Sequence, residues 1–459
     1  MIYDFIVVGS GSGGGALSYY LNKSGANVLL LEAGKFYRKD TFPKTEAETS
    51  AQLYWGGGIE FAQNGKMGFL RTKMVGGSSI VYQCLMDRFD DIAFNDWRAE
   101  SGVDWFTPEQ MDPHYSQVES DMVLHTFKRE EMRPNGILFA DACDKLGYKW
   151  GFLRRGQSDC GADKSNDCVG CLGGCFRDSK QSSLVAFIQK AEKEGLKIQA
   201  ETEIYKVEPN KDTCKIHGFH QGKPVTLEAK KVILCGGAFG STRIMTMSGY
   251  ASKLPALGKK FASHPQFMWL GFQNEPVDAH KGMFQSVASK DPNFRAQGFK
   301  LENVFASPIS IGMLMNVTGA KHQHYMKQYR YMQCIEVAVR DENIGEIKCD
   351  NKGKLTIVKP LTDQDKTRRD KGLHAIENIM NAAGAKEIFK SNFYFGLHLM
   401  GGCVMGTDAS KSVVNPDFQV HGEQTLYIAD SSIYPNAPGI NPGLTIKSLG
   451  HRLATQLLK

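Results

Sequence analysis

Apolar residues form two short runs near the start of the chain, with a helical pattern between them. Residues 5–8 and 28–31 are continuous apolar runs, which are typical of buried strands. Residues 16–24 separate the runs and have the composition of a short helix. The pattern therefore predicts a strand–helix–strand unit at the beginning of an α/β protein.

Further along the chain, helical and alternating periodicities predict a longer series of elements. Helices are expected at residues 111–124, 135–146, 180–194 and 363–383. Strands are expected at residues 197–209, 214–219, 223–229, 231–235, 267–272, 298–305, 331–339, 345–349, 355–358 and 426–429. Gln221 and Gly222 predict a hairpin turn within this series. The last helix is expected to run from Pro442 to Leu458, with Asn441 as its N-cap.

Composition is that of an ordinary globular protein of two or three domains. Hydrophobic residues make up 42% and charged residues 23% of the 459 positions, and the net charge is +6. Basic and acidic residues are interspersed, so no nucleic-acid-binding stripe is expected. No apolar run approaches the roughly 20 residues that cross a bilayer. The first strand begins at Asp4, so no leader is expected and the default location is the cytoplasm, or the periplasm if a partner subunit directs export.

A glycine-rich turn between the first strand and the first helix carries a nucleotide-binding signature. Gly9, Gly11 and Gly14 have the G-x-G-x-x-G spacing, which permits a tight turn and close approach to a pyrophosphate. Glu32 follows the second strand, where a carboxylate can accept hydrogen bonds from ribose hydroxyls. The unit predicts a dinucleotide site but leaves NAD and FAD as alternatives.

Two other glycine-rich segments can face a ligand. Residues 76–79 read Gly-Gly-Ser-Ser, and they can either supply donors to a flat ligand or form a surface turn. The strand at residues 231–235 runs into Gly236 and Gly237, which suggests a second nucleotide-facing turn.

Four cysteines gather within sixteen residues in the middle of the chain. They are Cys160, Cys168, Cys171 and Cys175, and the last three have the spacing C-x2-C-x3-C. Thiolates at this spacing can converge on an iron–sulfur cluster or on zinc. The alternative is a tight loop with buried thiols or one disulfide.

His398 is the strongest candidate for acid–base chemistry. Imidazole has a pKa close to working pH, so it can take a proton from a substrate hydroxyl, whereas the alternative role is a hydrogen-bonded core histidine. Asn441 is the candidate that would hold the substrate oxygen. His264 and His421 are expected to be structural.

Taken in order along the whole chain, these segments resemble the glucose–methanol–choline (GMC) oxidoreductases. The interval of 43 positions between His398 and Asn441 fits the two active-site residues of that family. The resemblance implies FAD as cofactor and hydride transfer from an alcohol carbon to the flavin. The residues that it assigns to FAD are Gly9, Gly11, Ser12, Gly13, Gly14, Glu32, Ala33, Gly76, Gly77, Ser78, Ser79, Gly237, Ala238, Asp430 and Pro442.

The cysteine-rich segment and the C-terminal half are most similar to the long-chain alcohol oxidase branch, which implies a small-molecule alcohol as substrate. The cysteines also resemble those of the flavoprotein subunit of bacterial sugar dehydrogenases, although the upstream pair is spaced differently. An iron–sulfur cluster that passes electrons to a small subunit or another acceptor protein is therefore an alternative function. Tyr82 replaces the family's common asparagine, and Val81 stands where some members attach FAD through histidine. Non-covalent FAD is expected.

The resemblance also implies a division of the chain. A Rossmann-like, discontinuous FAD-binding domain is expected from residues 1–100, 195–265 and 395–459. An interleaved α+β substrate domain on an antiparallel sheet is expected from residues 101–194 and 266–394, with the cysteine-rich loop at 158–176. Its middle part is rich in Met and aromatic residues, which either form a core or line an apolar pocket for a bulky alcohol.

Overall fold

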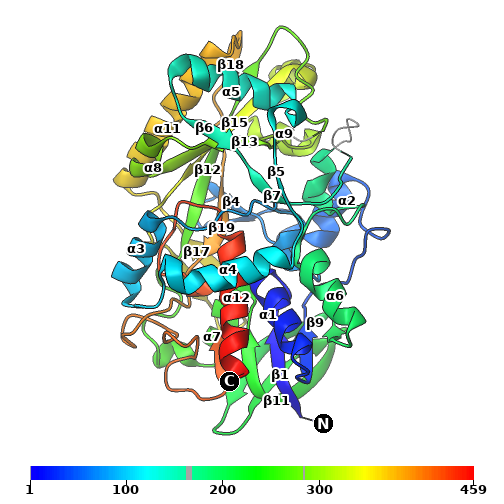
Figure 1. The fold of residues 1–459 in the computed structure, drawn as a ribbon, viewed down its shortest axis with the longest axis vertical. Coiled ribbons are helices and arrows are strands. Elements are labelled where there is room, and N and C mark those ends of the chain that lie inside the picture. The colour runs from blue at the N-terminus through cyan, green and yellow to red at the C-terminus, as the bar shows by residue number, and fades with distance from the viewer. Residues whose placement is uncertain (1, 162–167, 283–284) are drawn as a thin grey trace.

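A computed structural model describes residues 2–161, 168–282 and 285–459. Two sheets dominate it, of seven and nine strands within the described residues. The first lies near both chain termini at the bottom of Figure 1, and the second lies above it. The same part of the chain contains no helix with the length and apolar content needed to cross a bilayer.

The first sheet has the strand order β8-β2-β1-β11-β10-β9, and β20 pairs with β11. Its strands are β1 (Tyr3–Val8), β2 (Val28–Leu31), β8 (Lys197–Gln199), β9 (Thr202–Pro209), β10 (Cys214–His220), β11 (Lys223–Leu234) and β20 (Leu426–Ile428). β1 pairs in parallel with β2 and β11, and helix α1 (Ser12–Lys23) connects β1 to β2. The predicted strand–helix–strand unit is confirmed.

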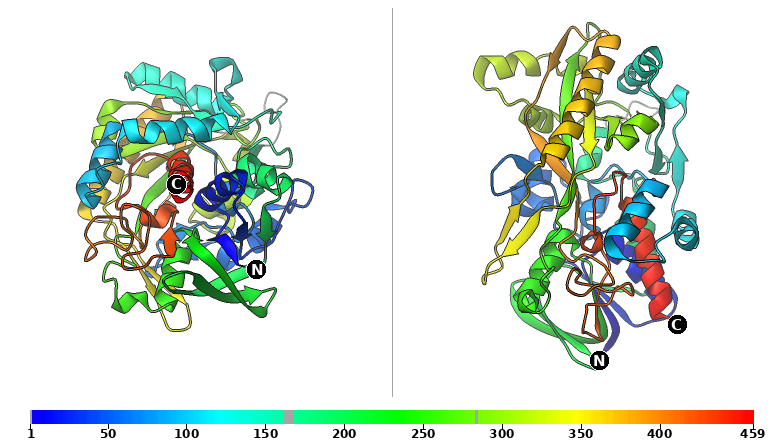
Figure 2. Two further views of the ribbon diagram at one scale, coloured as in Figure 1. Left: turned by 60° about the horizontal axis from the view of Figure 1, so that its bottom comes forward. Right: turned by 90° about the vertical axis from the view of Figure 1, so that its left-hand side faces the viewer.

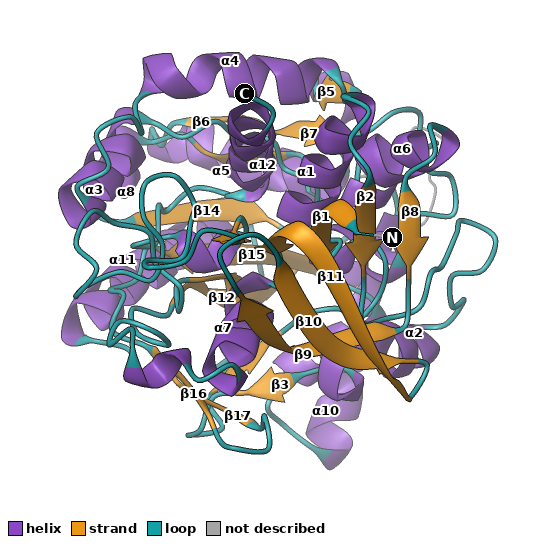
Figure 3. Ribbon diagram, turned by 90° about the horizontal axis from the view of Figure 1, so that it is seen from below, coloured by secondary structure: helices purple, strands orange, loops and turns teal. Residues whose placement is uncertain are grey.

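Strand β11 continues through both predicted strands of residues 223–229 and 231–235. Its first half pairs antiparallel with β10 across the predicted hairpin turn, and its second half pairs in parallel with β1 and β20. No glycine or proline interrupts it after Pro224, so one strand spans both parts of the sheet (Figure 3).

The second sheet has the order β3-β4-β19-β12-β15-β14-β13-β6, and β18 pairs with β12. Its strands are β3 (Glu60–Phe61), β4 (Met67–Phe69), β6 (Trp150–Phe152), β12 (Ala262–Phe272), β13 (Val287–Ser289), β14 (Phe299–Asn303), β15 (Met332–Val339), β18 (Glu387–Phe389) and β19 (Tyr394–Met400). All its pairs are antiparallel except β4 with β19, which confirms the predicted antiparallel sheet of a second domain.

The two faces of this sheet differ because side chains alternate along each strand. One face is apolar and packs against α5 (Pro134–Leu146) and α11 (Asp363–Ala382), which runs along the sheet in Figure 2, right. The other face is polar at its centre and lines a cavity between the two sheets.

The sheets divide the chain differently from the predicted boundaries at residues 100 and 395. Strands β3, β4 and β19 lie in segments assigned to the FAD domain, yet they pair in the second sheet. Helix α4 (Pro108–Ser120) lies in a substrate-domain segment but packs on α12 (Gly443–Leu457), which in turn packs on α1. These short segments pair with sheets that are distant in sequence, which local patterns do not reveal.

Several helix ends also differ from expectation. Thr107 accepts a capping hydrogen bond and starts α4 three residues early, at Pro108. The helix expected at residues 180–194 begins at Leu184 with a π turn, Leu184–Ile188, followed by α6 (Gln189–Lys193). The final helix begins at Gly443, and Asn441 is not its N-cap.

The remaining elements connect and cover the sheets. The helices are α2 (Glu46–Leu53), α3 (Asp91–Ser101), α7 (Gly237–Met247), α8 (Pro292–Ala296), α9 (Pro308–Leu314) and α10 (Gly319–Met326). The strand pairs are β5 (Leu124–Thr126) with β7 (Arg154–Gly156), and β16 (Glu346–Cys349) with β17 (Leu355–Val358).

Candidate active site

In the glycine turn after β1, one glycine leaves room for a side chain and two do not. A Cβ added to Gly9 would lie 2.3 Å from the carbonyl oxygen of Cys235, and one added to Gly14 would lie 1.9 Å from that of Gly9. Gly9 and Gly14 are therefore required for packing. A Cβ on Gly11 would meet nothing within 4 Å. Gly11 lines the cavity, so this is where a ligand can approach the backbone.

The start of α1 can hold an anion. Gly11 is its N-cap and provides no side-chain cap, and no acidic residue occupies the first turn. The first N–H groups of the helix and the positive end of its dipole therefore remain available to a phosphate.

The loop of residues 76–79 lies against the glycine turn and is not a surface turn. The N–H of Gly76 donates to the Ser10 hydroxyl oxygen at 2.9 Å, and that hydroxyl donates to Glu32 at 2.6 Å. A Cβ on Gly77, whose φ is 53°, would lie 2.8 Å from Cα of Gly11. Two segments distant in sequence thus form one wall of the cavity.

Glu32 and Asp430 are buried carboxylates at the ends of β2 and β20. Glu32 also accepts the N–H of Gly34 at 3.0 Å. Asp430 accepts the N–H of Gly237 at 2.8 Å and the hydroxyl of Ser241 at 2.6 Å, which fixes the second glycine turn. Burial raises the pKa of both carboxyl groups above their usual values.

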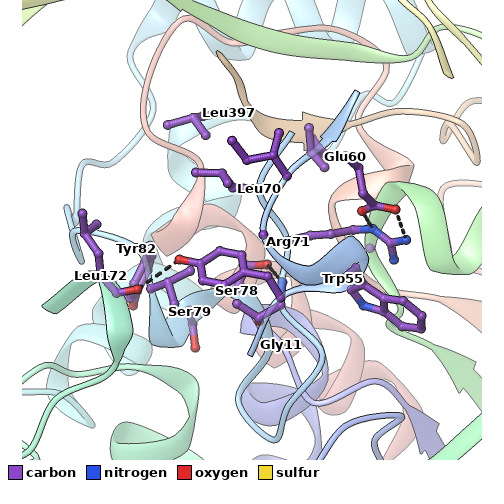
Figure 4. Close-up of a pocket in the computed structure, with 18 of the residues that line it drawn as sticks. Gly11, Trp55, Glu60, Leu70, Arg71, Ser78, Ser79, Tyr82, Leu172 and Leu397 are labelled. Atoms are coloured by element: carbon purple, nitrogen blue, oxygen red, sulfur yellow. Dashed lines mark hydrogen bonds and ion pairs between the residues drawn. The ribbon is translucent and has the colours of Figure 1, made fainter. Parts of the chain in front are cut away.

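These segments border one cavity of about 1430 Å³. This volume exceeds the roughly 300–1,000 Å³ of an ordinary ligand site. Of the predicted cofactor residues, Gly14 and Gly76 lie behind the wall, and the others line the cavity: Gly9, Gly11, Ser12, Gly13, Glu32, Ala33, Gly77, Ser78, Ser79, Gly237, Ala238, Asp430 and Pro442. A second wall, shown in Figure 4, holds Arg71, which pairs with Glu60 and lies over the ring of Trp55.

The cysteine-rich segment contributes backbone and apolar groups to the cavity. Leu172 lines it (Figure 4), and the carbonyl oxygen of Leu172 accepts a hydrogen bond from the Tyr54 hydroxyl at 3.0 Å. Cys160, Cys171 and Cys175 form no disulfide with one another, and the side chain of Cys168 lies outside the described residues. Among the described side chains we find no group of three His, Cys, Asp or Glu that could hold a metal. The predicted iron–sulfur centre is therefore not supported.

His398 lies at the other end of the cavity in a strained backbone conformation. Its φ is 57°, a left-handed value that is uncommon outside glycine. The pairing of β12 with β19 shifts register between Ala262 and His264, opposite this position. Such a bulge re-aims a side chain, so the strain is associated with the direction of the imidazole.

His264 contacts His398 directly and was missed as a site residue. Their Nδ1 atoms are 2.8 Å apart, and the N–H of Gly439 donates to Nε2 of His264 at 2.9 Å. Because Nε2 of His264 accepts the Gly439 N–H, the ring proton of neutral His264 lies on Nδ1 and points to His398. Neutral His398 then carries its own proton on Nε2. Burial and the nearby Lys300 charge lower the pKa of His398 to about 4, so the pair is neutral at pH 7.

Asn441 is fixed by Lys300, whose side chain is 14% exposed and which sequence reasoning also missed. Nζ of Lys300 donates to Oδ1 of Asn441 at 2.9 Å and pairs with Glu302 at 2.5 Å and Asp87 at 3.4 Å. The amide oxygen of Asn441 is therefore occupied, and its NH2 group remains to donate to a ligand. His264, His398, Lys300 and Asn441 surround one void of about 10 Å³.

Two features of the sequence point to this cluster. Lys300 and Glu302 are charged residues two positions apart within a strand predicted from its apolar residues, and Glu336 interrupts the next predicted strand in the same way. Residues two apart share a face, so their charges must be buried together or face a cavity. Only the sheet order shows that β14 and β15 are neighbours.

Profiles of the GMC oxidoreductase family match residues 50–266 and 351–450, which together cover more than half of the chain. The chain is a GMC oxidoreductase. It is therefore an oxidoreductase acting on CH–OH donors, and FAD is the family's cofactor.

Relatives of this GMC oxidoreductase span nearly the whole chain. An uncharacterized GMC-type oxidoreductase of Sinorhizobium fredii is 24% identical and covers 99% of this chain and 94% of its own. A long-chain-alcohol oxidase of Arabidopsis thaliana is 25% identical over 99% of this chain and 68% of its own. Pyridoxine 4-oxidase of Mesorbium loti has the same fold, with a TM-score of 0.75 at 15% identity and 99% of each chain covered.

The residues of the cavity fit FAD. The open side of Gly11 and the uncapped start of α1 suit the pyrophosphate, and Glu32 borders the same region. Pro442 and the uncapped N-terminus of α12 line the cavity near His398 and Asn441, where helix N–H groups can stabilise negative charge on a ring. The volume leaves space for a substrate beside the dinucleotide.

Proposed function

We propose that this GMC oxidoreductase oxidises the CH–OH group of an alcohol with an apolar body, with His398 as proton acceptor. The observation that supports it best is the shared void: His398 and Asn441 border the same small space, and both also line the main cavity. FAD, when bound, supplies the hydride acceptor. Asn441 would donate to the substrate oxygen and hold the carbon toward the flavin.

Acceptance of the proton requires a change of tautomer in the histidine pair. In the form that can accept a proton, Nε2 of His398 is unprotonated and Nδ1 of His398 carries the proton. Nδ1–H of His398 then donates to Nδ1 of His264. The N–H of Gly439 would lose its acceptor, which costs about 1–3 kcal/mol. A hydrogen bond from the substrate hydroxyl to Nε2 of His398 would offset part of this, roughly 0.5–1.5 kcal/mol. Substrate binding would thereby select the accepting form.

The pH dependence of flavin reduction tests the state of this pair. A protonated pair cannot accept a proton, and the pKa of His398 is lowered to about 4. We expect the reduction rate at saturating alcohol to be constant from about pH 8 to about pH 5 and to fall through about pH 4. Lys300→Met removes a nearby positive charge, so the pKa and the fall should move to higher pH. A wild-type fall centred near 6.5, the ordinary value, would contradict the buried neutral pair.

Flavin release tests the prediction of non-covalent FAD. Val81 lines the cavity at the position where some family members carry the attaching histidine, and it offers no nucleophile. We expect denaturation in acid or detergent to leave all flavin in the supernatant. Flavin that stays with the precipitated chain would show a covalent link elsewhere.

The alternative function, electron transfer through a cysteine-bound cluster to a partner protein, has one specific observation in its favour. Lys180 is buried next to Cys171 and Cys175: its Nζ donates to the carbonyl oxygen of Cys171 at 2.5 Å, and its backbone N–H donates to Sγ of Cys175 at 3.5 Å. Iron and acid-labile sulfide in anaerobically purified protein would support this alternative. A cytoplasmic location, or export with such a partner, remains a prediction.

The proposed function is tested by anaerobic mixing of the flavin-loaded protein with alcohols. We expect primary or secondary alcohols with apolar bodies to bleach the oxidised flavin in a single phase. A flavin that stays oxidised with every alcohol, but is reduced by dithionite, would contradict alcohol oxidation.

A further inference from the structure

The polar face of the second sheet carries a compact group of side chains that the proposed reaction does not use. Gln266 on β12, Glu336 on β15, Glu302 on β14 and Gln285 just before β13 all line the cavity. Each is only 2–4% exposed. Buried polar groups that line a cavity need hydrogen-bond partners, which the protein or a ligand must supply.

Strand register brings these side chains together. Glu302 is directly opposite Glu336, and Met268 is opposite Glu336 on the other side. Gln266 is opposite Ala338, which is in turn opposite Lys300, one step along the same face. The group is therefore adjacent to the Lys300–Asn441 contact.

Hydrogen bonding within the group is incomplete. Nε2 of Gln285 donates to Glu302 at 2.5 Å, and Glu302 lies opposite Glu336 on the neighbouring strand. The Oε1 atoms of Gln266 and Gln285 have no hydrogen-bond partner within the described part of the chain. A buried acceptor left unpaired in this way is destabilising, and a donor on a ligand can satisfy it.

The charges of the group are balanced without a ligand. Lys300 pairs with Glu302 and Asp87, and Lys290 lies 3.7 Å from Asp87. Burial and the charge of Glu302 raise the pKa of Glu336 well above its usual value, which disfavours the charged form of Glu336. The two lysines balance the two carboxylates of Glu302 and Asp87. The remaining acceptors are therefore suited to a neutral hydrogen-bond donor and not to a further cation.

The rest of this wall is apolar. Met268, Val304, Phe305, Met313 and Leu314 line the cavity beside the polar group. A ligand there meets an apolar surface and, at the inner end, a set of acceptors. An alcohol with an apolar body alone would bury those acceptors without partners.

We propose that Glu336, with Gln266 and Glu302, recognises a second hydroxyl group on the substrate, so that the enzyme prefers hydroxylated alcohols to simple alkanols. The hydroxyl donates to the carboxyl of Glu336 or to the amide oxygen of Gln266. This inference rests on the proposed alcohol oxidation and specifies its substrate class. Sites that hydrogen-bond a substrate hydroxyl discriminate strongly against analogues that lack it, because their own polar groups are then left unpaired.

The test compares 1-hexanol with the 1,2-, 1,3-, 1,4- and 1,6-hexanediols and with 6-amino-1-hexanol, using the flavin-loaded protein. Binding is followed by the change in flavin absorbance and turnover by anaerobic flavin reduction. We expect at least one diol to exceed 1-hexanol by tenfold or more in kcat/KM and in affinity. Equal values for 1-hexanol and all diols would overturn the inference while leaving alcohol oxidation intact. A preference for the amino alcohol, which carries a positive charge, would overturn the inference that the group binds a neutral donor.

Two variants assign any preference to Glu336. Glu336→Gln keeps an acceptor of the same size, whereas Glu336→Met removes it. We expect the ratio of diol affinity to 1-hexanol affinity to be unchanged in Glu336→Gln and to fall toward one in Glu336→Met. Gln266→Leu removes a different acceptor and provides an independent test. The absorbance titration measures this affinity ratio even if no alcohol reduces the flavin. An absence of flavin reduction would contradict the proposed alcohol oxidation but not the proposed hydroxyl recognition. A ratio unchanged in Glu336→Met and in Gln266→Leu would exclude this site.

Discussion

His398→Asn is expected to fold, to bind FAD and to lose about 10²- to 10⁴-fold of the rate of flavin reduction, the usual contribution of a general base. Asparagine is chosen because it tolerates the left-handed φ of 57° found at this position. Its amide cannot take up a proton at working pH. The measurement is anaerobic flavin reduction by a substrate alcohol, with bound flavin and melting temperature recorded for each protein.

His421→Asn is the matched control. His421 contacts Ser412 at 2.8 Å and does not border the cavity. The same substitution there should leave the reduction rate within about twofold of the wild type, because the residue touches no reacting group. A His398→Asn protein with full flavin content and an unchanged rate would remove His398 from the mechanism.

Gly11→Val is expected to give a folded protein without flavin. Gly11 has φ of −64° and ψ of −162°, which any residue can adopt, and its Cβ would point into open space in the cavity. The valine side chain would then occupy the place proposed for the pyrophosphate. Circular dichroism should match the wild type, while the flavin absorbance of the purified protein should be lost.

Two further variants show whether the loss is steric and local. Gly11→Ala adds one methyl group and should retain more flavin than Gly11→Val. Gly14→Ala should instead lower the melting temperature, because its methyl group would lie 1.9 Å from the carbonyl oxygen of Gly9 and overpacking costs about 1–3 kcal/mol. Normal flavin content in Gly11→Val would mean that the dinucleotide does not cross this turn.

The first nucleotide-binding unit could be predicted from sequence because each part of it is local. Strand, glycine turn, helix and second strand follow one another, and Gly9 and Gly14 are required by contacts within the unit or with the turn at Cys235. The positions of His398 and Asn441 were predicted from a family resemblance, and the structure brings both to one void. Their roles remain predictions.

Other features could not be predicted because they depend on pairing between distant segments. The bulge between β12 and β19 brings His264 against His398, and nothing local to either residue shows this contact. Asn441 was expected to cap the last helix, but Lys300 occupies its amide oxygen. A long-range charge–dipole contact took precedence over a local capping preference.

In the Met- and aromatic-rich region, composition alone could not tell which side chains form the core and which line the cavity. Met268 and Met313 line the cavity, whereas Met315 and Met332 are buried in the core and Trp269 packs on the opposite face of the sheet. Both alternatives were therefore correct for part of the region. Composition also did not reveal the buried carboxyl groups among those apolar residues, which change the expected substrate.

The most direct test of the account is the rate of flavin reduction with an alcohol deuterated at the carbinol carbon, measured under nitrogen in wild type and His398→Asn. If hydride leaves that carbon for the flavin while His398 takes the hydroxyl proton, deuterium should slow reduction several-fold in the wild type, and His398→Asn should reduce its flavin at least a hundredfold more slowly. Reduction at equal rates with both isotopes and in both proteins would contradict the central claim.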